Sequence, residues 1–259
     1  MKIAVCVKQI PDPAAPYELD PDTHFVQRPA DQVLDDTDRY GVELGLQLAE
    51  ATDGSVVLVS MSPAGSLQGI RQALAMGADK AVVVDDEALA GSGALVTARV
   101  LAAAIAAEGD VDLVIAGTES TDGYTGVVPQ MLAELLDMPS LTFARKVEVA
   151  DGTVTIERQT TGGYAVVESG LPALVSVTAG VVEPRYPTFK GIMQAKSKPI
   201  DQPSAADLGF EAGDVGIEGS GQRITDVRPA PEREAGEKIV DEGEAHLEIV
   251  KLLETKKVI

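Results

Sequence analysis

The sequence alternates short runs of aliphatic residues with longer amphipathic stretches, and this alternation limits the possible folds more than any other feature. The expected strands are Ile3–Val7, Val56–Ser60, Ala81–Val84, Val111–Ala116 and Leu174–Val177. The expected helices are Asp38–Ala51, Ser66–Met76, Gly93–Ala107 and Val128–Leu136. Continuous aliphatic runs indicate strands that are buried on both faces. Strands that alternate with helices predict right-handed βαβ units, so we expect an α/β fold with a doubly wound, mostly parallel sheet.

The rhythm changes after the fourth expected helix. Arg145–Val149 and Val154–Arg158 flank Asp151-Gly152, which is a two-residue turn signal for an antiparallel hairpin. Tyr164–Val167 could add a third strand. We therefore expect antiparallel edge strands on the parallel sheet.

The C-terminal part of the chain has a different character. Residues 201–236 are rich in Gly, Pro, Asp and Glu and show little periodicity, whereas Glu242–Thr255 resumes a helical pattern. A short isolated helix cannot bury its apolar face alone. We therefore divide the chain into an α/β domain, 1–200, and an extended arm with a C-terminal helix, 201–259, which needs a second chain to pack on.

Composition excludes several classes of function. The net charge of −20 opposes binding to nucleic acid and to anionic membranes. A single cysteine, Cys6, rules out an internal disulfide, and with two histidines the chain offers no metal site rich in Cys or His. The start lacks a signal-peptide pattern, and no apolar stretch is long enough for a membrane span. We expect a cytoplasmic protein that is not embedded in a membrane.

A glycine-rich loop follows the fourth expected strand. Gly117, Gly123 and Gly126 are interspersed with hydroxyl residues, and Pro129 stands in the first turn of the next helix. Glycines let a ligand approach the backbone, and free N–H groups at a helix start bind phosphate. The loop matches neither the dinucleotide fingerprint nor the P-loop, and Glu119 and Asp122 add negative charge. Phosphate binding and a plain strand-to-helix connection therefore remain equally open.

Other strand ends lie at the same edge of the expected sheet, where ligands of open α/β sheets bind. Lys8 follows the first strand, Met61 the second, and Asp35–Asp38 precedes a helix. Each also has a simple structural interpretation: Asp38 as a helix N-cap, Met61 as a core residue and Cys6 as a small buried hydrophobe. His24 and His246 have no nucleophile or acid at a suggestive spacing, so we expect no catalytic residues.

Residues 185–198 form a basic stretch in an otherwise acidic chain. Arg185, Lys190, Lys196 and Lys198 occur without an acid between them, together with Tyr186, Phe189, Ile192 and Met193. Exposed apolar residues bordered by cations are typical of protein-docking surfaces. A solvated loop with Phe189 turned into the core is the equally weighted alternative.

Four segments resemble the electron-transfer flavoprotein β-subunit family. They are the opening KIAVCVKQIPD, the segment IRQALAMGADKAVVV, the loop AGTESTDGYTGVVPQMLAELLDMP and the stretch EPRYPTFKGIMQAKSKPI. The resemblance runs in order over at least residues 1–200, and the terminal VxxGEAHxxIVKxL pattern extends it. It implies an adenine-nucleotide α-hydrolase type of fold, paired as a heterodimer with an α subunit that holds most of a redox FAD.

The resemblance also implies a bound AMP without a catalytic role. The implied contacts are Cys6, Asp35, Asp36, Thr37, Asp38, Met61, Gly117, Thr118, Glu119, Ser120, Thr121, Asp122, Gly123, Tyr124, Thr125, Gly126, Val127 and Val128.

The basic stretch is, by the same resemblance, a recognition loop for acyl-CoA dehydrogenases and other flavin dehydrogenases, as in fatty acid oxidation. The implied docking residues are Arg185, Tyr186, Phe189, Lys190, Ile192 and Met193, with Phe189 as the apolar anchor. Electrons would leave towards a membrane quinone-linked oxidoreductase. The arm and terminal helix would wrap the α subunit.

Some positions depart from the family pattern. Gln194 and Ser197 replace lysines of animal relatives, Gln159 stands where some relatives have an acid, and Tyr17 is the nearest aromatic to the expected place after Asp12. A bifurcating subset binds a second FAD and NADH, and its loop has a GDTAQ-like run that Gly123–Val127 lacks. We therefore favour AMP. A third alternative is an ATP-binding regulator similar to universal stress proteins.

Overall fold

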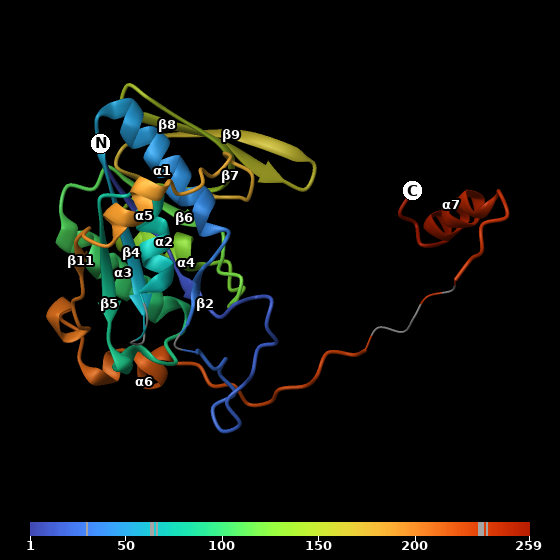
Figure 1. Ribbon diagram of the computed structural model, residues 1–259, viewed down its shortest axis with the longest axis horizontal. Coiled ribbons are helices and arrows are strands. Elements are labelled where there is room, and N and C mark those ends of the chain that lie inside the picture. Colours follow the sequence, from blue (N-terminus) through green and yellow to red (C-terminus); the bar gives the residue numbers. More distant parts are fainter. Residues whose placement is uncertain (30, 63–64, 66, 233–235, 237) are drawn as a thin grey trace. The chain divides into compact units, whose positions relative to one another are not determined.

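The computed structural model describes residues 1–29, 31–62, 65, 67–232, 236 and 238–259 (Figure 1). The chain forms two compact units, Met1–Ile224 and Thr225–Ile259. Within the described residues, no helix has the length and hydropathy needed to cross a membrane.

A nine-stranded sheet organises the described part of the first unit. Its order is β11 (Ile200–Asp201), β5 (Lys80–Asp85), β4 (Ser55–Ser62), β1 (Lys2–Cys6), β6 (Leu113–Gly117), β10 (Ala173–Val177), β7 (Ser140–Ala150), β8 (Thr153–Thr160) and β9 (Gly163–Gly170). Neighbours from β11 to β7 are parallel, while β7, β8 and β9 pair antiparallel. The predicted α/β class, mostly parallel sheet and antiparallel edge are confirmed.

Helices cover both faces of the parallel part, as the doubly wound prediction requires (Figure 1). The helices are α1 (Asp38–Thr52) and α2 (Gln68–Met76) on one face, and α3 (Ala94–Glu108) and α4 (Val128–Leu135) on the other. Alternate residues of β1 supply the two cores: Ile3 and Val5 face α1, whereas Ala4 faces α3. A Cβ at Gly45 would lie 2.9 Å from Val5 Cγ2, so this glycine lets α1 pack closely on the sheet.

The predicted strands and helices lie within about two residues of those observed wherever an apolar run is continuous. Ser66, the predicted start of α2, lies outside the described residues. A second, small antiparallel sheet joins β2 (Gln9–Ile10) to β3 (Val33–Leu34).

Residues 201–224 differ from the expected extended arm. Here the compact unit continues through β11, η2 (Ala206–Leu208), η3 (Ala212–Asp214) and α6 (Gly216–Ser220). A further short helix, η1 (Glu87–Leu89), lies earlier in the chain, between β5 and α3. Ala205 and Val215 are buried in the core on the α3 face. These turns are too short to produce a periodic pattern, which explains why they were not predicted. The second unit contains the predicted terminal helix, α7 (Ala245–Thr255).

Candidate functional site

The strand order reverses between β1 and β6. β1 neighbours β4 on one side and β6 on the other, and the chain reaches these neighbours over opposite faces of the sheet. Ligands of doubly wound sheets bind at such a point, beyond the carboxyl ends of the strands. Cys6 ends β1 and Gly117 ends β6. The glycine-rich segment Gly117–Val128, hereafter the switch-point loop, therefore starts at the place where this fold binds ligands.

Three of the predicted contact residues line the α3 face at this edge. Cys6, Met61 and Val128 are partly buried and pack against the same hydrophobic cluster. Burial raises the pKa of the Cys6 thiol to about 12, with a further contribution from Asp38. The thiol is therefore neutral at physiological pH, and Cys6 acts as a small apolar wall residue.

The backbone of the switch-point loop leaves donors available. The N–H groups of Thr125, Gly126, Val127 and Val128 donate to no acceptor in the part of the chain that the structure describes. Gly126 has φ of 65°, a conformation that favours glycine. In the first turn of α4, Gln130 Oε1 is buried and has no hydrogen-bond partner among the described residues. Free N–H groups at a helix start and a buried unpaired acceptor fit the phosphate and hydroxyl groups of a nucleotide.

The side chain of Asp122 is turned inward, although its negative charge counted against phosphate binding in the sequence. Its side chain is fully buried, with Lys8 Nζ 2.6 Å from Oδ1, and Arg28 Nη2 donates to Oδ2. Burial opposes ionisation, but the two cations outweigh it and hold the pKa of Asp122 below its usual value. Asp122 therefore ties the switch-point loop to the N-terminal segment, and its charge is compensated within the fold. Nothing in the local sequence around Arg28 signalled this role.

Two further acids join the same network. Asp35 Oδ2 accepts hydrogen bonds from Thr121 N at 2.7 Å and Thr121 Oγ1 at 3.0 Å, and its other oxygen binds Thr37. Asp38 Oδ2 accepts a hydrogen bond from Lys8 N at 2.7 Å. Burial, reinforced by the charge of Asp35, raises the pKa of Asp38 well above its usual value. The structure thus brings both acids to the switch-point loop.

Asp38 does not act as the N-cap that the sequence suggested. It is the first residue of α1, the N-cap position belongs to Thr37, and neither side chain makes a capping hydrogen bond. The Asp38 carboxylate instead binds the backbone that follows β1. A local pattern could not reveal this partner, because it lies 30 residues away.

The remaining predicted contacts divide between structural and exposed positions. Thr118 Oγ1 donates to Val177 O at 3.0 Å, and Ser120 Oγ lies 3.3 Å from Lys8 Nζ. Asp36 is exposed and pairs with Arg39 at 3.1 Å. Tyr124 is exposed with φ of 49°. Thr118 and Ser120 therefore hold the loop, while Tyr124 is open to a ligand or a partner.

The basic stretch 185–198, hereafter the docking segment, contains α5 (Phe189–Ala195), which the sequence did not predict. Phe189 is 82% exposed, so the alternative in which it turns into the core is wrong. Tyr186, Ile192 and Met193 are also exposed. Phe189, Ile192 and Met193 are spaced i, i+3 and i+4, so they share one face of α5, and Lys190 beside Phe189 is exposed as well.

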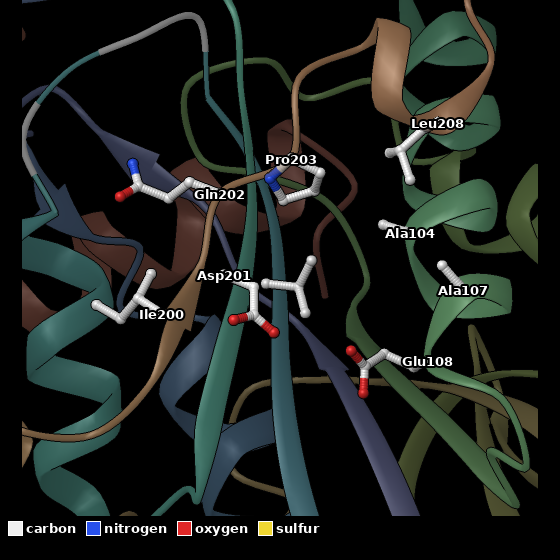
Figure 2. Close-up of a pocket in the computed structure, with 9 residues that line it drawn as sticks. Ala104, Ala107, Glu108, Ile200, Asp201, Gln202, Pro203 and Leu208 are labelled. Carbon is white, nitrogen blue, oxygen red and sulfur yellow. The ribbon is translucent and has the colours of Figure 1, made fainter.

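Two shallow cavities lie away from the switch-point loop. One, of about 470 Å³, opens between α3 and β11 (Figure 2). Glu108 on its wall is paired with Lys80 at 2.8 Å and Lys2 at 3.3 Å, so its charge is already neutralised. The other, of about 370 Å³, lies beside Phe143 and Gln159. Among the described residues, no cluster of His, Cys, Asp and Glu could hold a metal ion.

Comparison with known proteins gives a consistent result. The family described as "Electron transfer flavoprotein domain" matches residues 23–208. "Electron transfer flavoprotein subunit beta" of Mycobacterium tuberculosis is 41% identical over 99% of both chains. The protein of the same name from Megasphaera elsdenii is 33% identical over 100% of both chains. The "Caffeyl-CoA reductase-Etf complex subunit CarD" of Acetobacterium woodii is 32% identical over 92% of each.

Proposed function

The chain belongs to the electron transfer flavoprotein β-subunit family, and from this premise we propose that it works in a heterodimer with a flavin-carrying α subunit. The heterodimer carries electrons from acyl-CoA dehydrogenases and other flavin dehydrogenases to a quinone-linked oxidoreductase, and it does so in the cytoplasm. The full-length similarity to named β subunits carries this proposal.

The second compact unit supports the need for a partner chain. Within this unit α7 has no buried residue, and its exposed apolar side chains are Leu247, Ile249, Val250 and Leu252. An eleven-residue helix with an uncovered apolar face is marginal in water. Packing on the α subunit would cover this face. The sequence led to the same expectation for the arm and terminal helix, 201–259.

The switch-point loop is the proposed AMP site. Its free N–H groups suit the phosphate, and the wall of Cys6, Met61 and Val128 suits an apolar ring face. In this proposal AMP is structural, and FAD, held mostly by the α subunit, supplies the redox chemistry. The residues of this chain bind and orient the AMP and exclude water from it.

The docking segment is the proposed contact for dehydrogenases. Phe189 is its apolar anchor, and a small apolar contact with a charged border suits transient binding. Replacing Phe189 by Ala should slow electron uptake from a reduced acyl-CoA dehydrogenase about tenfold while bound FAD stays constant. Unchanged uptake would contradict the anchor assignment.

A second candidate is the bifurcating subunit that the family resemblance raised, and the similarity to a subunit of a caffeyl-CoA reductase-Etf complex is a reason to test it, because that relative works in a complex with a reductase. One experiment separates the candidates: co-purify the chain with its α subunit, denature the complex and quantify the released nucleotides. We expect one FAD and one AMP per heterodimer. Two FAD would establish the bifurcating alternative, and ATP without flavin would support the stress-protein-like regulator.

A further inference from the structure

The docking segment is tied to the body of the fold at its start. Arg185 makes a two-pronged ion pair with Glu43 of α1, with Nε 2.7 Å from Oε2 and Nη2 3.0 Å from Oε1. Its third nitrogen, Nη1, lies 2.6 Å from Glu50 Oε1. Glu43 is only 3% exposed, so its charge depends on Arg185 for compensation. These bonds raise the pKa of Arg185, which is permanently charged.

The segment is tied again at its end. Lys198 Nζ donates to three carbonyl oxygens at the C-terminus of α2: Leu74 at 3.2 Å, Gly77 at 2.9 Å and Ala78 at 2.5 Å. A cation at this place compensates the unpaired carbonyls and the negative end of the helix dipole. Lys198 is therefore committed to α2.

Between these ties, α5 lies directly on α2. A side chain at Gly191 would collide with the carbonyl oxygen of Ala75. Arg71 Nη1 donates to Ala195 O at 3.1 Å, and Thr188 Oγ1 caps α5 by accepting from Gly191 N at 3.0 Å. The segment is therefore a fixed platform, in contrast to a solvated loop.

The ties decide which charges a partner can meet. Of the four cations in the segment, Arg185 and Lys198 are directed inward. Lys190 and Lys196 are exposed and form no ion pair within the described residues. They stand in the same short segment as the exposed apolar side chains Tyr186, Phe189 and Met193.

We propose that Arg185 and Lys198 are positioning residues that do not touch the partner, and that a flavin dehydrogenase meets the apolar patch with Lys190 and Lys196 as its cationic border. This inference rests on the proposed docking function. The partner surface that fits is an apolar pocket bordered by carboxylates, because the patch is cationic in a chain of net charge −20. The fixed platform lowers the conformational cost of docking.

Replacing Glu43 by Gln in the αβ heterodimer separates positioning from contact. Glu43 is buried and cannot reach a partner, so its effect travels through the groups that it binds, Arg185 and its α1 neighbour Gln47. If Arg185 positions the platform, the variant should take up electrons from a reduced acyl-CoA dehydrogenase three- to tenfold more slowly, with unchanged dependence on ionic strength. If Arg185 contacts the partner, freeing its guanidinium should strengthen docking and steepen that dependence, which would overturn the proposal.

Matched variants complete the test. Glu218→Gln removes an exposed acid of α6 and should leave uptake unchanged, while Lys190→Gln with Lys196→Gln should flatten the salt dependence. Hydrogen exchange of residues 186–197 in the heterodimer should rise at least tenfold in Glu43→Gln; unchanged protection would overturn the proposal without any dehydrogenase present. Should Glu43→Gln not fold, Glu50→Gln removes the exposed arm of the tie and should give a smaller effect of the same sign.

Phe189→Ala distinguishes failure of this inference from failure of the proposed function. If Phe189→Ala leaves uptake intact, the docking function itself is wrong. If Phe189→Ala slows uptake but Glu43→Gln does not, docking stands and the positioning role of Arg185 is refuted.

Discussion

The switch-point loop and the docking segment each pair a charged side chain with the body of the fold but present different surfaces. In the loop, Asp122 is buried against Lys8 and Arg28, and the backbone N–H groups of residues 125–128 have no acceptor among the described residues. In the docking segment, Arg185 is bound to Glu43, and aromatic and aliphatic side chains remain outside. Asp122 in the loop and Arg185 in the docking segment therefore fix backbone position. Lys190 and Lys196 differ from them because they stay exposed.

The two ties differ in depth. The Asp122 side chain is fully buried between two cations, whereas the Arg185 side chain is 34% exposed. Breaking a buried pair leaves an unpaired charge in a medium of low polarity, and solvent relieves this cost at a half-exposed site. The comparison thus predicts a graded series of effects.

The largest effect is expected for Asp122→Asn. An amide cannot neutralise Lys8 and Arg28, so the free energy of unfolding of the heterodimer should fall by about 3 kcal/mol in urea denaturation. Released AMP should fall in parallel, because the loop loses its tie. Asp36→Asn, which removes the exposed ion pair with Arg39, is the control and should change stability by less than about 0.5 kcal/mol. Equal effects of the two variants would contradict the comparison.

A smaller loss is expected for Arg185→Met. The substitution strands the buried carboxylate of Glu43 but leaves it near solvent through the gap, so we expect a loss of about 2 kcal/mol. The double variant with Glu43→Gln should lose less than the sum of the single variants, as measured in a double-mutant cycle. Strict additivity would show that the two side chains do not act as a pair.

The third effect has the opposite sign and depends on pH. Since the folded-state pKa of Asp38 is raised, its stabilising contribution is present below the unfolded pKa of about 3.9 and is lost as pH rises through the folded value. Asp38→Asn can keep an acceptor for Lys8 N–H without the buried charge. Its melting temperature should exceed that of the unmodified protein by about 2–4 °C at pH 8 and by less at pH 5.5. A gap that widens towards acid would refute the assignment.

The smallest effect on stability is expected for Phe189→Ala. The side chain is 82% exposed, so its removal should change the free energy of unfolding by less than about 0.5 kcal/mol while docking weakens. A large loss of stability would show that Phe189 packs on the fold. It would then contradict the distinction between residues that hold the docking segment in place and residues that contact the partner.

Long aliphatic elements could be predicted from the sequence, and short or non-local ones could not. β1, β4, β5, β6 and β10 follow from continuous runs of buried residues, and α1 and α3 from helices of fifteen residues. α5 was missed because seven residues that follow Pro187 and include Gly191 give no readable period. The placement of β10 between β6 and β7 is a tertiary property.

The candidate site shows the same limit. The sequence places Cys6, Met61 and the start of the switch-point loop at the ends of strands. Because the carboxyl ends of parallel strands share one edge of a sheet, their common location could be predicted. The ion pairs that hold the two segments could not be predicted from the sequence, because Arg28 and Asp122 are 94 residues apart and Glu43 and Arg185 are 142 residues apart. Charge pattern reveals that a segment is unusual, and only the fold reveals which charges are already paired.

The uncovered face of α7 has a consequence for how the cell handles this chain. Within the second unit itself, no described residue covers Leu247, Ile249, Val250 and Leu252. A copy without its partner would therefore present apolar surface of the kind that chaperones and proteases recognise. We expect surplus β chains to be removed and assembled ones to be spared. Exposure of α7 would then mark unassembled chains for degradation, and this would keep the amounts of the two subunits equal.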